Sequence, residues 1–236
     1  MFAVVCINEP QRSFFGRRKC AVEMLLSPVK GAAPYKVINV TPGKKGIDWK
    51  TVSAAAGCCN STMLLPDCVL PPANTDIGLF EPSVLPQLIL LNTVADMISK
   101  SEKQRTSVLI EDRNALLSAY IRRIVPFAAK ITVLTDAPEK YVKDTVSIME
   151  EFGASIRICS GVDETEQFDI AVSEKKVGSA GLTLIPCEVK EKLKAEDIPD
   201  EYRRMCPEGI DEFLFVCALF ECCGLKSAGE LTLSQV

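Results

Sequence analysis

The chain has 236 residues, of which 47% are hydrophobic and 25% are charged, and its formal net charge is −4. This composition predicts a globular protein of one large or two modest domains with a buried core. No apolar run reaches the length that is needed to span a bilayer. The first ten residues lack the basic start and the long apolar stretch of a signal peptide, so we expect a cytoplasmic protein.

The sequence contains no histidine. This absence excludes Ser-His-Asp and Cys-His catalytic pairs, imidazole metal ligands and imidazole acid-base chemistry near neutral pH. Any catalysis would have to use carboxylates, lysine, cysteine or tyrosine. The absence favours a non-catalytic role and leaves an enzymatic one open.

Eleven cysteines are present, and most lie inside apolar runs. In a cytoplasmic protein we expect them to be reduced and to act as small hydrophobic residues. The adjacent pairs Cys58-Cys59 and Cys222-Cys223 do not have the spacing of zinc ligands, and C-x-x-C is absent. We therefore expect no metal site.

Short apolar runs bounded by prolines and turn formers predict a small N-terminal α/β domain in residues 1–100. A helix at Leu85–Ile98, with apolar residues at helical spacing, is expected to bridge this domain to the next. The other expected elements are strands at Phe2–Ile7, Cys20–Leu26, Tyr35–Val40 and Thr62–Leu65, and a helix from Asp48 to Gly57.

Between the first two strands, four basic residues flank a pair of phenylalanines: Arg12, Arg17, Arg18 and Lys19. Basic side chains beside aromatic rings can hold phosphate or single-stranded nucleic acid. Four positive charges are a small cluster for an acidic chain, however, so a solvated hairpin loop is favoured over a nucleic-acid site.

Residues 105–187 predict a parallel α/β unit, because strands and helices alternate there. The expected strands are Thr106–Ile110, Lys130–Leu134, Ser155–Cys159, Phe168–Val172 and Leu182–Ile185, and the expected helices run from Asp112 to Pro126 and from Pro138 to Gly153. Only eight residues separate the third strand from the fourth, which is too few for a helical crossover. One face of the sheet is therefore expected to lack its usual helices.

The strand SVLIE at residues 107–111, the helix expected after it, and Asp136 resemble an NAD(P)-binding Rossmann domain over about a third of the chain. The resemblance implies a nucleotide-binding sheet in which Asp136 occupies the position of the ribose-binding acid. In place of the family's G-x-G-x-x-G, the chain has Glu111, Asp112, Arg113, Asn114, Ala115 and Leu116. Side chains there would fill the phosphate space, and two carboxylates would repel a phosphate. Ordinary NAD(P) binding is therefore disfavoured, and the sequence identifies no other cofactor.

Ligands of open α/β sheets bind beyond the carboxyl ends of the strands. The candidate ligand-binding residues at that edge are Glu111, Asp112, Arg113, Asp136, Ser173 and Glu174. This mainly acidic set favours a ligand with hydroxyls or a positive group, such as a nucleoside or an amine. Alternatively, Asp112 simply caps its helix and the other residues are solvated strand ends.

Residues 188–236 predict a helical extension. A charged helix is expected at Glu188–Ala195, and the apolar run Phe213–Phe220 predicts a helix that is buried on nearly all sides. We expect this second helix to cover the bare face of the central sheet or to lie between the domains. Leu231–Val236 could add an edge strand. The expected architecture is thus a Rossmann-like sheet with a smaller N-terminal domain and C-terminal helices packed across the sheet.

Charge is unevenly distributed along the chain. Residues 1–50 carry nine Lys or Arg against three Asp or Glu, whereas residues 161–236 carry eight against sixteen. Three functions stay open. The first is a non-catalytic Rossmann-like binding or interaction protein, acting as a homo-oligomer or with a protein partner. The second is a nucleotide-dependent or NAD(P)-dependent enzyme that uses carboxylates or lysine. The third is a structural subunit that docks through its oppositely charged ends.

Overall fold

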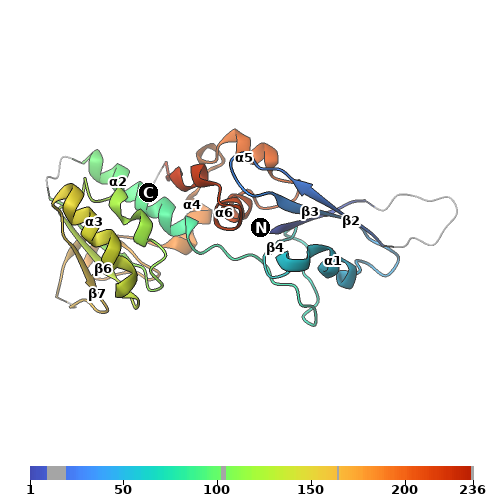
Figure 1. Ribbon diagram of the computed structural model, residues 1–236, viewed down its shortest axis with the longest axis horizontal. Coiled ribbons are helices and arrows are strands. Elements are labelled where there is room, and N and C mark those ends of the chain that lie inside the picture. The colour runs from blue at the N-terminus through green and yellow to red at the C-terminus, as the bar shows by residue number, and fades with distance from the viewer. Residues whose placement is uncertain (10–19, 102–104, 164, 235–236) are drawn as a thin grey trace. The chain divides into compact units, whose positions relative to one another are not determined.

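The computed structural model describes residues 1–9, 20–101, 105–163 and 165–234, and the chain divides into two compact units (Figure 1). The first unit consists of Met1–Pro82 and Ile198–Gly229, and the second of Ser83–Asp197 and Glu230–Val236. Each unit is built on one β-sheet. The predicted basic loop of Arg12, Arg17, Arg18 and Lys19 lies outside the described residues.

The sheet of the first unit has the strand order β2-β3-β1-β4. Strand β1 pairs in parallel with β3 and β4, and β2 pairs antiparallel with β3 along the sheet edge. The helix α1 begins after Asp48, whose side chain accepts a hydrogen bond from the Thr51 backbone N–H and so caps the helix. The elements are β1 (Ala3–Ile7), β2 (Ala21–Ser27), β3 (Tyr35–Thr41), α1 (Trp49–Ala56) and β4 (Met63–Leu64).

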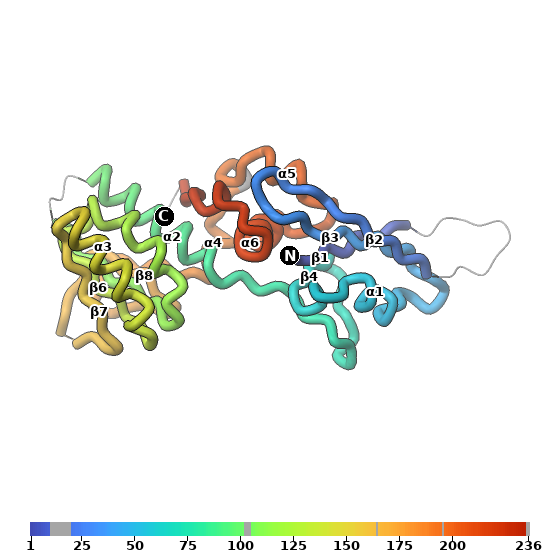
Figure 2. Tube along the Cα trace, viewed as in Figure 1, coloured from blue at the N-terminus to red at the C-terminus, as the bar shows by residue number. Residues whose placement is uncertain are grey.

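Two C-terminal helices, α5 (Asp200–Met205) and α6 (Glu212–Cys223), belong to this first unit. Figure 2 shows α5 in orange and α6 in red, beside the blue N-terminal strands. Three buried aromatic rings join the two ends of the chain. Phe2 stacks on Tyr35 at 5.1 Å between ring centroids, and Tyr35 and Phe215 pack in a T-shaped arrangement with their centroids 5.3 Å apart. The N-terminal strands and the C-terminal helices therefore share one core.

The apolar run Phe213–Phe220 lies in α6, which belongs to the first unit and not to the unit of the central sheet. The expected bridging helix, α2 (Leu85–Ser99), falls in the second unit. A helix that is apolar on nearly all sides has no preferred face, so its pattern does not tell which sheet it covers.

The second sheet confirms the predicted parallel α/β architecture. Its strand order is β7-β6-β5-β8-β9 and every pairing is parallel. Counted from the first strand of the unit, this is the order 3-2-1-4-5 of a Rossmann-like sheet. The strands are β5 (Ser107–Glu111), β6 (Lys130–Leu134), β7 (Ile156–Cys159), β8 (Phe168–Val172) and β9 (Ala180–Leu184).

Helices pack on one face of this sheet. Helix α2 contacts β8, the 3-10 helix Ser118–Arg123 and α4 (Val189–Lys192), and the same 3-10 helix contacts α3 (Val142–Phe152). On the other face, Leu109, Leu134 and Ala171 form a small apolar cluster that loop residues, including Val162 and Val177, help to cover. No helix occurs at 160–163 or 165–167, as the short crossover predicts.

Two further predicted elements were wrong. Residues 112–126 form a turn and a 3-10 helix instead of an α-helix, because the Asp112 carboxylate takes the backbone N–H groups of Leu116 and Leu117. Residues 231–234 form no strand. Instead, Leu231 accepts a hydrogen bond from Asn92 and Leu233 donates one to Thr93, both on α2.

The remaining short helices are of the 3-10 type. They are Gly57–Cys59, Pro138–Tyr141, Pro186–Glu188, Ala195–Asp197 and Lys226–Glu230. Within the described ranges, no helix is both long enough and apolar enough to cross a membrane.

The aromatic contact in the first unit can be tested by replacing Phe215 with alanine. Phe215 is fully buried, so we expect the variant Phe215→Ala to lose about 3–5 kcal/mol in the free energy of unfolding. The single tryptophan, Trp49, lies in α1 of the same unit, so its fluorescence during urea denaturation reports the loss. The matched control is Phe152→Ala in the second unit, where the ring is 42% exposed. An unchanged Trp49 transition in Phe215→Ala would contradict this packing.

Candidate functional site

The turn after β5 is organised around the side chain of Asp112, which is almost completely buried. One carboxylate oxygen, Oδ1, accepts a hydrogen bond from the Leu116 N–H at 2.8 Å. The other, Oδ2, accepts from the Leu117 N–H at 2.7 Å and from the Tyr141 hydroxyl at 2.5 Å. Backbone N–H groups at such a turn are the donors that bind phosphate in nucleotide-binding sheets. Here the chain's own carboxylate occupies two of them.

Tyr141 completes the shell around this carboxylate. Its side chain is fully buried, and burial, together with the hydrogen bond to Asp112, raises the pKa of Tyr141 far above its usual value. The hydroxyl therefore keeps its proton and acts as a donor to Asp112. In the sequence, Tyr141 is simply one residue of the helix expected from Pro138 to Gly153. No local pattern indicated that its hydroxyl would meet a strand end 29 residues earlier.

Ala115 gives the same turn an unusual backbone conformation. Its φ is 55°, and it is the one non-glycine residue with positive φ among the residues that the structure describes. This left-handed conformation costs roughly 1–2 kcal/mol in a residue with a Cβ. The bend that glycines normally allow is thus formed here by an alanine, and the hydrogen bonds from Leu116 and Leu117 back to the Asp112 side chain span it.

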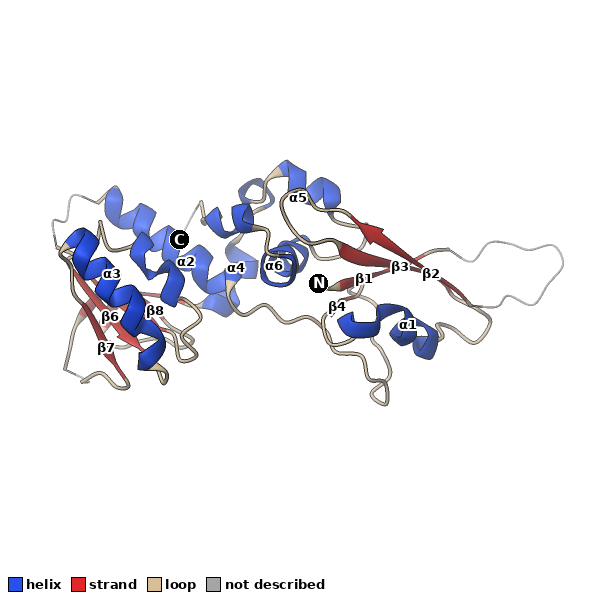
Figure 3. Ribbon diagram, in the orientation of Figure 1, coloured by secondary structure: helices blue, strands red, loops and turns tan. Residues whose placement is uncertain are grey.

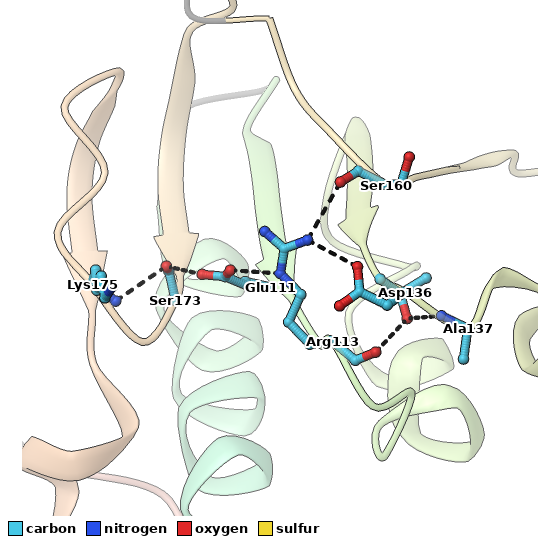
Figure 4. A network of polar contacts seen from close by, with 8 residues as sticks. Glu111, Arg113, Asp136, Ala137, Ser160, Ser173 and Lys175 are labelled. Carbon is cyan, nitrogen blue, oxygen red and sulfur yellow. Dashed lines mark hydrogen bonds and ion pairs between the residues drawn. The ribbon is translucent and has the colours of Figure 1, made fainter.

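Outside the buried turn, a polar network runs along the carboxyl ends of four strands (Figure 4). Arg113 Nε donates to Glu111 at 2.9 Å, and Arg113 Nη1 donates to Asp136 at 3.1 Å and to the Ser160 carbonyl at 3.3 Å. The Ser173 hydroxyl donates to the second oxygen of Glu111. The network links residues at the ends of β5, β6, β7 and β8.

Glu111 is the most enclosed acid of this network, with a side chain that is 19% exposed. Burial acts to raise its pKa, but hydrogen bonds from Ser173 and Arg113 and the nearby Arg113 charge outweigh that effect. The pKa of Glu111 is therefore lowered from its ordinary value. Glu111 is held ionised, and its carboxylate is used to position the Arg113 guanidinium.

Asp136 forms the open end of the network. Its side chain is 66% exposed, compared with 37% for Arg113. Arg113 is paired with two carboxylates, which reduces its capacity to bind a phosphate. The part of the network that faces solvent is therefore the Asp136 carboxylate with a guanidinium beside it, and this carboxylate can accept hydrogen bonds from hydroxyl or amino groups.

The predicted site residues divide into an inner and an outer group. Glu111, Arg113, Asp136 and Ser173 come together in the outer network, and the backbone of Glu174 also hydrogen-bonds Glu111. Asp112 points inward and belongs to the buried turn. The sequence missed Tyr141 and the carbonyl of Ser160. The chain matches no protein-family model, no curated protein and no solved structure.

Two of the cysteines, Cys206 and Cys223, do not supply a reactive group. Burial raises the pKa of the Cys206 thiol to about 12, with a further contribution from the nearby Glu212 and Asp211. Burial also raises the pKa of Cys223 to about 11. These thiols are protonated at neutral pH and are poor nucleophiles. Across the described part of the chain, cysteine, aspartate and glutamate side chains nowhere gather in a group of three that could hold a metal ion.

The pH dependence of stability tests the role of Glu111. Because its pKa is lowered in the folded state, Glu111 contributes stability above its unfolded pKa of about 4.3, and this contribution is lost as the pH falls through the folded pKa. We expect Glu111→Gln to be less stable than the wild type at pH 7 and to approach it below about pH 4. Hydrogen exchange of the β5 and β6 amides measures this difference. A difference in stability between the wild type and Glu111→Gln that stays constant with pH would show that the carboxylate charge is not involved.

Proposed function

We propose that this chain is a non-catalytic binding or interaction protein, built on a Rossmann-like sheet that has lost ordinary dinucleotide binding. One observation carries the proposal: the carboxylate of Asp112 binds the N–H groups of Leu116 and Leu117. In a dinucleotide-binding sheet, the pyrophosphate lies at this turn. In this chain the Asp112 carboxylate takes the place that the pyrophosphate would occupy on these N–H groups.

A pyrophosphate would have to displace or approach this carboxylate, and both routes are costly. Displacement would leave the buried Tyr141 hydroxyl without its acceptor, at about 1–3 kcal/mol. Approach would place like charges close together, at about 4 kcal/mol for a pair 4 Å apart at an effective dielectric constant of 20. The strained turn at Ala115 also places a Cβ where glycine would leave space.

The titratable groups support the non-catalytic part of the proposal. A general acid or base works best with a pKa near the working pH. The pKa of Tyr141 is raised far from neutrality, that of Glu111 is lowered, and those of Cys206 and Cys223 are raised. The chain also has no histidine, the side chain whose ordinary pKa lies near neutral pH.

The exposed carboxylate of Asp136 favours a second candidate, a nucleotide-dependent enzyme that recognises its substrate through the sugar. Asp136 follows β6, at the position where a Rossmann sheet holds the ribose hydroxyls. A nucleoside could donate its hydroxyls to this acid without placing a phosphate against Asp112. This candidate predicts binding of adenosine and no gain from added phosphates.

Thermal denaturation with a panel of ligands separates these functions. We expect no stabilisation by NAD(H), NADP(H), S-adenosylmethionine, ATP or adenosine at millimolar concentration. A ligand at 100 times its dissociation constant would add about 2.7 kcal/mol, which is well within detection.

The outcomes of this panel lead to different conclusions. Stabilisation by adenosine that is lost in Asp136→Ala, while Glu139→Ala keeps it, would favour the second candidate over the first. Stabilisation by NAD(H) with micromolar affinity would refute the loss of dinucleotide binding. The control Glu139→Ala removes an exposed acid three residues further along the chain.

A further inference from the structure

Strand β2 is the edge strand of the first sheet, as can be followed in Figure 3. It pairs with β3 through all seven of its residues, from Ala21 opposite Thr41 to Ser27 opposite Tyr35, with no bulge in the register. Its other edge carries backbone N–H and C=O groups that no other strand of the described chain pairs with. This is a regularly paired edge strand of the kind that can accept another strand.

Three consecutive large apolar residues lie exposed on this strand. Met24 is 44% exposed, Leu25 is 50% exposed and Leu26 is 58% exposed. Successive strand residues point to opposite faces, so the exposed apolar surface continues around both faces of the edge. Val22, nearer the start of β2, packs partly against the core cluster that includes α1 residues. Residues 24–26 of the strand therefore lie outside the core packing that partly buries Val22.

The edge lacks the features that usually keep edge strands apart. Natural edges are protected by lysines, prolines, bulges or short strands. Strand β2, with the sequence AVEMLLS, has Glu23 as its one charge, and it contains no lysine and no proline. An unprotected apolar edge of seven residues indicates a surface that is paired in the working protein.

We propose that β2 pairs antiparallel with β2 of a second copy of this chain, about a two-fold axis at Leu25. Two four-stranded sheets then form one continuous sheet. In this register, Leu25 lies opposite Leu25 of the second copy, Met24 lies opposite Leu26, and Glu23 lies opposite Ser27. The apolar residues meet each other and no two like charges are directly opposed. A two-fold interface needs such a self-complementary patch. The inference is independent of the function proposed for the second unit.

A second exposed apolar surface competes with β2 as the contact. Helix α3 carries Val142, Val146, Met149 and Phe152 in a stripe, each between 42% and 59% exposed. This stripe offers side chains alone, because the backbone hydrogen bonds of a helix are made within the helix. Strand β2 offers apolar side chains and open backbone groups together. The α3 stripe therefore supplies the matched control.

The test is the mass of the full-length protein in solution, measured by light scattering after size exclusion over a range of concentrations. We expect a dimer of twice the 25.8 kDa chain mass. The variant Leu25→Lys places two ammonium groups opposite each other at the axis, and it should raise the dimer dissociation constant at least about tenfold. The control Val146→Lys, also at an exposed apolar position, should leave the dimer unchanged.

Two further measurements complete the test. Leu25 is half exposed, so Leu25→Lys should keep the circular dichroism spectrum and the Trp49 fluorescence of the folded wild type. Hydrogen exchange should be slower in the β2 amides of the wild-type dimer than in Leu25→Lys. A wild-type monomer at all concentrations overturns the proposal. So does a dimer that survives Leu25→Lys, and so does a dimer that dissociates in Val146→Lys.

Discussion

The buried carboxylate of Asp112 is the contact on which the second unit depends. It accepts hydrogen bonds from two backbone N–H groups of its own turn and from the hydroxyl of Tyr141. This one side chain therefore connects the end of β5, the start of the 3-10 helix and the segment that leads into α3. Three donors stabilise a buried anion that would otherwise be costly to remove from water. Because those donors are used internally, the same contact that stabilises the fold is also the basis for the proposal that the sheet has lost anion binding at this turn.

The polar network above this turn follows from the topology of the sheet. Parallel strands bring their carboxyl ends to one edge, so Glu111, Asp136, Ser160 and Ser173 meet although they are far apart in the sequence. Arg113 lies among them and is held by acids from both sides. At this edge the Asp112 carboxylate holds two N–H groups of its own turn, whereas the Asp136 side chain is exposed. The proposed loss of dinucleotide binding depends on the first of these features. A protein with such an edge can still present the rest of its surface to a partner.

Much of the fold could be predicted from the sequence, because its strands are short apolar runs separated by strong turn signals. The candidate residues could be predicted as a set for the same reason, since each follows a strand. The direction of each side chain could not. Asp112 was expected to cap an α-helix, and it instead turned inward and prevented one. Tyr141 and Ala115 depend on contacts and a backbone angle that no local pattern encodes. The position of α6 in the first unit depended on aromatic contacts between chain ends.

The most direct test of the internal anion is to remove it. The stability of Asp112→Gly should be measured against the concentration of inorganic phosphate, beside the wild type and Asp112→Asn, whose amide keeps an acceptor in the turn. We expect phosphate to stabilise Asp112→Gly, because the N–H groups of Leu116 and Leu117 become available, and to leave the wild type and Asp112→Asn unchanged. If phosphate stabilises the wild type as strongly as Asp112→Gly, or leaves a folded Asp112→Gly unaffected, the carboxylate does not stand in for a bound phosphate.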